Sequence, residues 1–74
     1  GKVGAIGGID LKMQGAKRDG ATWFLAPADN CAQVVGKVPA GLRDVKVSSL
    51  EDAYTALVKI GNGQADSLPH CTVE

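Results

Sequence analysis

The stretch that most constrains the fold is residues 4–20, with the sequence GAIGGIDLKMQGAKRDG. A short apolar run ends there at two adjacent glycines, Gly7 and Gly8, and a helical pattern follows. Three apolar residues of this pattern recur at i, i+4 and i+7 and so share one face: Ile9, Met13 and Ala16. Gly20 stands where a left-handed C-cap would end the helix. The pattern predicts a strand that turns sharply into a helix.

Lys12 lies in the first turns of this helix, three residues after Ile9 and four before Ala16. This spacing places it at the margin of the buried face. A lysine serves as a general base only when it is neutral near pH 7, so its pKa must fall by roughly three units from about 10.4. The helix N-terminus supplies part of that shift, and desolvation must supply most of it. The alternative interpretation is a solvated lysine on an amphipathic helix, beside Lys17 and Arg18.

Two further runs are typical of strands. Residues 22–26, TWFLA, are β-branched and aromatic and stop at Pro27, which indicates a buried strand. The run at residues 2–6, the helix that follows it and the run at residues 22–26 together predict a βαβ unit whose strands are parallel. Residues 44–48 alternate polar and apolar side chains, as a strand near a sheet edge does.

Two more helices are predicted. Asp29 or Asn30 would cap the first, which carries apolar residues at helical spacing and is broken by residues 39–41: Cys31, Val34, Val35 and Val38. Ser48 as N-cap and Glu51 at N3 form a capping-box pattern that opens the second. That helix would run over residues 50–60, end at 61–63 and bury one stripe: Leu50, Ala53, Tyr54 and Leu57.

The expected fold class is α/β (α+β), a small βαβαβα domain with three mostly parallel strands and three helices. Its 74 residues form one domain, with a core at residues 1–60 and an irregular tail at residues 61–74. A domain of this size buries only about 60% of its unfolded surface and is marginally stable alone.

Three segments resemble, in order, the C-terminal part of the proteolytic domain of Lon proteases: residues 7–12, 15–21 and 27–30. The chain is most similar to the ATP-independent, PDZ-containing Lon-like serine proteases of bacteria. The resemblance implies that Lys12 is the catalytic partner of a serine. The family's serine lies upstream in a Pro-Ser-Ala-Gly motif, which this chain lacks. Its own serines stand elsewhere, at Ser48, Ser49 and Ser67.

Charge and hydropathy narrow the possible partners. Eight basic and eight acidic residues cancel, so no net charge steers the chain to nucleic acid or to an anionic membrane. No apolar run is long enough for a membrane span, and no signal peptide is present. The chain starts at Gly1 rather than methionine, so we expect a fragment or a processed piece. The resemblance implies a membrane-anchored, extracytoplasmic parent.

Cys31 and Cys71 are the only cysteines. If paired, they would pin the tail, but a cytosolic chain would keep them reduced; the resemblance to exported proteases implies the disulfide. One alternative is a Cys31–His70 pair of nucleophile and base. Another is a metal site built from four residues whose spacing fits no structural zinc pattern: Cys31, Asp66, His70 and Cys71. The glycine-rich turn at residues 4–8 matches no phosphate-binding motif, and Trp23 is expected in the core. We expect no cofactor and no metal.

The expected function is peptide-bond hydrolysis by a Ser–Lys dyad, to which this chain contributes Lys12. The chain alone is expected to be inactive, because it lacks the nucleophilic serine. The expected partners are a protein or peptide substrate, the remainder of its own proteolytic domain and, in the parent protein, further copies in a homo-oligomer. Nucleic acid is not expected as a partner. The alternative is a non-catalytic Lon-like scaffold or assembly domain, as in DNA-repair ATPases that contain this fold.

Overall fold

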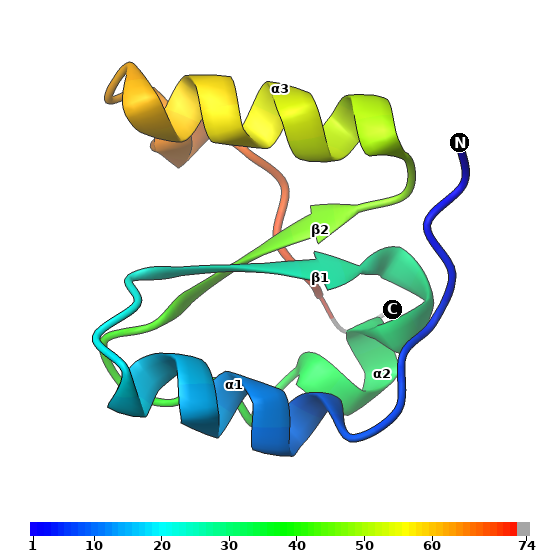
Figure 1. The fold of residues 1–74 in the computed structure, drawn as a ribbon, viewed down its shortest axis with the longest axis vertical. Helices are drawn as coiled ribbons and strands as arrows, with labels where there is room; N and C mark the ends of the chain where they lie inside the picture. Colours follow the sequence, from blue (N-terminus) through cyan, green and yellow to red (C-terminus); the bar gives the residue numbers. More distant parts are fainter. Residues whose placement is uncertain (73–74) are drawn as a thin grey trace.

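A two-stranded parallel sheet lies at the centre of the computed structural model, which describes residues 1–72 (Figure 1). Strand β1 (Trp23–Pro27) pairs with β2 (Arg43–Val47), and Trp23 lies opposite Arg43. Helices α1 (Ile9–Arg18) and α2 (Cys31–Val34) lie on one side of the sheet, and α3 (Leu50–Gly61) lies on the other. The molecule is therefore a small α+β fold of three layers, with three α-helices as predicted.

A separate apolar cluster fills each of the two interfaces between helices and sheet. The cluster under α1 and α2 contains Ile9, Met13, Ala26, Val34, Leu42 and Cys71. The cluster under α3 contains Val45, Val47 and Ala56, with Trp23 and Leu25 packed against them. Because successive strand residues point to opposite faces, neighbouring residues of β1 supply both clusters.

The predicted strand at residues 2–6 is wrong, and so is the βαβ unit built on it. Within the described chain, this segment makes only an isolated antiparallel bridge between Lys2 and Ser49, supported by a bond from Val3 N–H to Ser48 O. The parallel pairing instead joins β1 to β2 through the 3₁₀ turn η1 (Ala28–Asn30) and α2. The Asn30 side chain hydrogen-bonds to both the N–H and the O of Ile6, the groups that a neighbouring strand would have used.

Helix α2 is shorter than predicted. It ends at Val34, because Val35 adopts an extended ψ of 127° and Gly36 follows with a φ of +78°. Glycine adopts a positive φ without steric cost, so the chain leaves the helical path at Gly36. Val35 and Val38 still pack against the core, although not from a helix.

Helix α3 begins at the predicted residue and ends one residue later than predicted, but it buries a different face. Ala56 is 1% exposed and Ala53 is half-buried, whereas the three large residues of the predicted stripe are 60–70% exposed: Leu50, Tyr54 and Leu57. The two alanines let the helix axis approach the sheet closely. The large apolar side chains of α3 therefore form a surface that no described residue covers.

The tail contains a short 3₁₀ turn, η2 (Ala65–Ser67), and then follows the outer edge of β2. Lys46 N–H donates to Pro69 O over 2.9 Å, and Cys71 N–H donates to the Asp44 carboxylate over 2.7 Å. The structure thus adds Cys71 to the core, although the sequence placed the core boundary at residue 60. The last two residues of the predicted tail lie outside the described part. No helix among residues 1–72 is long and apolar enough to cross a membrane.

Candidate functional site

The Lys12 side chain bends back over the N-terminus of α1. Its Nζ donates to Gly7 O over 2.9 Å, and its backbone N–H donates to Gly8 O over 3.1 Å. The residue is exposed rather than at the margin of the buried face. No carboxylate lies within ion-pair distance of Lys12 in the described chain, where the one ion pair joins Arg43 to Asp66.

The turn that carries these carbonyls depends on Gly8. This residue has φ 62° and ψ 34°, in the left-handed region, and it serves as the N-cap of α1 without a side-chain hydrogen bond. An L residue with a side chain is strained in that conformation, whatever the space around it. The glycines therefore permit the sharp turn that brings Gly7 O to the lysine.

Asn30 holds the other end of the same turn. Its side chain is 1% exposed, its Oδ1 accepts from Ile6 N–H over 2.8 Å, and its Nδ2 donates to Ile6 O over 2.9 Å. Nδ2 also donates to Gln33 Oε1 over 2.7 Å. Only a helix-capping role was predicted for Asn30, so this role was missed. The one available signal was its place three residues after the proline that ends a buried strand.

A shallow hollow of about 270 Å³ adjoins the turn. Its walls come from the turn, from the start of α1 and from the α2 side: Ile6, Gly7, Gly8, Ile9, Asp10, Gln33 and Lys37. Its lining is mixed, with two isoleucines beside Asp10, Gln33 and Lys37.

Cys31 and Cys71 are joined by a disulfide, with their Cα atoms 5.0 Å apart. Both sulfurs are therefore occupied, which removes the thiol that a Cys31–His70 pair or a cysteine metal site would need. His70 Nδ1 lies 3.1 Å from Cys71 O. Residues 1–72 contain no group of three or more His, Cys, Asp or Glu side chains that could hold a metal ion.

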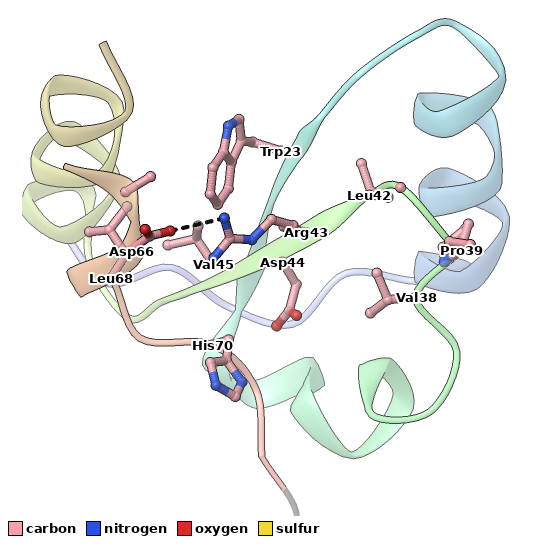
Figure 2. Close-up of a pocket in the computed structure, with 13 residues that line it drawn as sticks. Trp23, Val38, Pro39, Leu42, Arg43, Asp44, Val45, Asp66, Leu68 and His70 are labelled. Atoms are coloured by element: carbon pink, nitrogen blue, oxygen red, sulfur yellow. Dashed lines mark hydrogen bonds and ion pairs between the residues drawn. The ribbon is translucent and has the colours of Figure 1, made fainter. Parts of the chain in front are cut away.

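A second hollow, of about 360 Å³, lies at the opposite ends of the strands (Figure 2). The Arg43 guanidinium stacks over the Trp23 ring at 4.5 Å and pairs with Asp66 over 3.1 Å. Trp23 is half-buried against the α3 cluster, so its ring is part of the packing, as expected. Arg43, the cation over this ring, is already paired with Asp66. Neither of these two charged residues therefore leaves an unpaired charge in the hollow.

The three serines are engaged away from Lys12. Ser49 caps α3, Ser48 bonds through its backbone to Asp52 and Val3, and Ser67 Oγ donates to Gln64 O in η2. In the described residues, the site thus contains a positioned amine and a polar turn but no nucleophile. Comparison with known protein families, with curated proteins and with solved structures finds no match for this chain.

Proposed function

We propose that this chain is the lysine-bearing part of a Ser–Lys dyad endopeptidase of the Lon-like kind, whose serine lies in the remainder of the proteolytic domain. The observation that carries the proposal is the arrangement of Lys12: its Nζ is tethered to Gly7 O, and no carboxylate pairs with it within residues 1–72. A carboxylate partner would hold the amine in its charged form, whereas a general base must be neutral.

The tether suits the chemistry of a general base. A neutral amine has two N–H groups and one lone pair, and Gly7 O accepts one of the N–H groups. The lone pair then remains for the serine proton, which would pass to Lys12 during attack on the carbonyl carbon and return to the leaving amine. Because Lys12 is exposed here, the remainder of the domain would have to remove water from it.

The open edge of β1 supports the proposed partner. Arg43 N–H donates to Thr22 O, so in a parallel ladder the backbone groups of Trp23 and Leu25 point away from β2. No described residue pairs with that edge, whereas the tail covers part of the outer edge of β2. Parallel sheets are almost always larger and covered on both faces. A further strand from the remainder of the domain would satisfy the free groups of β1.

The apolar surface of α3 supports the same partner. Leu50, Tyr54, Leu57 and Val58 are exposed along one side of the helix. Exposed apolar groups of this kind mark contact surfaces in soluble proteins. An open strand edge and an uncovered helix face fit a subdomain that packs against a second one.

The test is a set of lysine variants in the full-length protein. Lys12→Ala should lower peptidase kcat by at least about 1000-fold, because the serine loses its proton acceptor. Lys12→Arg should lose as much, since guanidinium stays protonated and cannot act as a base. Lys17→Ala is the matched control, because Lys17 is an exposed lysine of the same helix, and it should stay within about twofold.

Near-normal turnover of Lys12→Arg would show that a positive charge, not a neutral amine, is needed, and would overturn the dyad. Unchanged function of the parent protein in Lys12→Ala would favour the scaffold alternative.

A further inference from the structure

We infer that Asn30 is a positioning residue for Lys12: through two hydrogen bonds to Ile6, its buried side chain fixes the turn whose Gly7 carbonyl holds the lysine amine. The inference rests on the proposed function, which assigns a role to Lys12 but none to Asn30.

The turn needs an anchor at Ile6. The segment before α1 forms no strand there, and the Ile6 side chain is 40% exposed, so neither a sheet ladder nor apolar burial holds it in place. The Asn30 amide supplies what a neighbouring strand would: one acceptor for Ile6 N–H and one donor for Ile6 O. A primary amide matches the peptide group in both roles.

A short path of backbone joins Ile6 to the lysine amine. Gly7 follows Ile6 directly, and its O accepts from Lys12 Nζ over 2.9 Å. Gly8 then turns the chain into α1, and its O accepts from Lys12 N–H. Two glycines adjoin this carbonyl, and they offer little resistance to rotation. The position of Gly7 O is therefore set from outside the turn, at Ile6.

Asn30 is itself held firmly. It ends η1, immediately after β1, and the next residue is Cys31, which the disulfide ties to Cys71. Its side chain is nearly inaccessible, and Gln33 accepts a third hydrogen bond from it. In Figure 1 the N-terminal segment passes beside this part of the chain on its way to α1. Asn30 thus fixes the turn at residues 6–8, which holds Lys12, relative to the sheet and to α2.

The first arm of the test measures the clamp without reference to catalysis. In the 74-residue chain, amide hydrogen exchange by NMR should show Ile6 N–H exchanging at least about tenfold faster in Asn30→Ala, because its hydrogen-bond acceptor is gone. Asn62→Ala, which removes an exposed asparagine at the end of α3, should leave Ile6 unchanged. Gln33→Ala should have a smaller effect than Asn30→Ala, because it spares both bonds to Ile6.

The second arm is a double-mutant cycle in the full-length peptidase, assayed with an activated ester so that residual rates stay measurable. Asn30→Ala should lower kcat by about 10- to 100-fold, the size expected when a base is misplaced by about 1 Å. In a Lys12→Ala background the same change should cost less than about twofold, because Asn30 acts through Lys12. A merely structural role would lower both rates by the same factor.

Two results would contradict the role of Asn30. Unchanged Ile6 exchange in Asn30→Ala, or equal losses in the two backgrounds, would overturn the inference. If Asn30→Ala does not fold, the second arm decides with Asn30→Asp, which keeps the acceptor for Ile6 N–H but lacks the donor for Ile6 O; it should show the same non-additivity. Failure of the proposed function is recognised separately, because Lys12→Ala would then leave the rate unchanged while the exchange arm still reports the clamp.

Discussion

Two adjacent serines precede α3, and only the second caps it. Ser49 has an extended backbone, with φ −147° and ψ 166°, and its Oγ accepts from Asp52 N–H over 3.0 Å. The Asp52 carboxylate in turn accepts from Ser48 N–H. The predicted pair of Ser48 and Glu51 is therefore wrong by one residue, although the predicted kind of cap is present.

The serine pair gives a prediction at this scale. Ser49→Ala should lower the free energy of unfolding by about 1 kcal/mol, the usual cost of losing an N-cap hydroxyl. Ser48→Ala should stay within about 0.5 kcal/mol, since only its backbone is used. Urea unfolding of both variants measures the difference, and an equal loss in the two would contradict the assignment of the cap.

The reason for the shift by one residue is tertiary. Residues 1–3 bond to Ser48 O and to Leu50 N–H and bridge to Ser49, and so support the extended backbone that an N-cap requires. Asn30 illustrates the same limit, because its partner Ile6 lies 24 positions away. Residue types at these sites are visible in the sequence, whereas the partners that define their roles are not.

At the scale of the element, α3 shows which of two apolar faces a sheet selects. Its exposed side carries the larger apolar residues, and its buried side carries alanines. Large apolar residues at helical spacing predict burial when a single partner is assumed. That assumption fails here, because the described residues cover α3 on one side only.

A matched pair of leucines tests this orientation. Leu57→Ala in the 74-residue chain should change the free energy of unfolding by less than about 0.5 kcal/mol, since Leu57 is 60% exposed. Leu42→Ala should cost about 2–5 kcal/mol, because Leu42 is 5% exposed and lies in the core under α1. Thermal or urea denaturation compares them, and a large loss in Leu57→Ala would mean that α3 packs with its other face inward.

The other elements were predicted correctly where local periodicity decides their structure, and wrongly where it does not. Residues 9–18, 23–27, 43–47 and 50–61 carry strong local periodicity, and their types were predicted with ends within about two residues. Residues 2–6 are apolar but find no neighbouring strand among the described residues. The continuation of α2 was wrong because the positive φ of Gly36 outweighs the valine spacing.

At the scale of the whole molecule, the disulfide connects elements that are far apart in the chain. It joins the start of α2 to the tail that runs along β2, across a sequence separation of 40 residues. A chain of this size buries too little surface for high stability, so a cross-link of this span has a large effect.

Removal of the disulfide should lower the free energy of unfolding by about 4 kcal/mol in the chain-entropy model. Cys31→Ser and Cys71→Ser should each have the same effect as a dithiol reductant acting on the unmutated chain. Urea midpoints with and without reductant measure it, and intact mass before and after alkylation reports the pairing. Two free thiols in oxidised material would contradict the structure.

The class of fold and the three helices could be predicted from the sequence at this scale, but the order of the sheet could not. Parallel pairing depends on which strand lies beside β1, and the sequence offered residues 2–6 as readily as residues 43–47. The place of Lys12 in the first turns of α1 was predicted, whereas its exposure was not, and its tether depends on a turn that Asn30 holds.

The same cross-link makes the chain between Cys31 and Cys71 a closed ring. A protease that cuts one peptide bond inside this ring, for example in the exposed segment around Gly36 and Lys37, produces two ends but no separate fragments. The nicked molecule keeps its mass apart from one added water, and it runs as a single band until a reductant divides it into two.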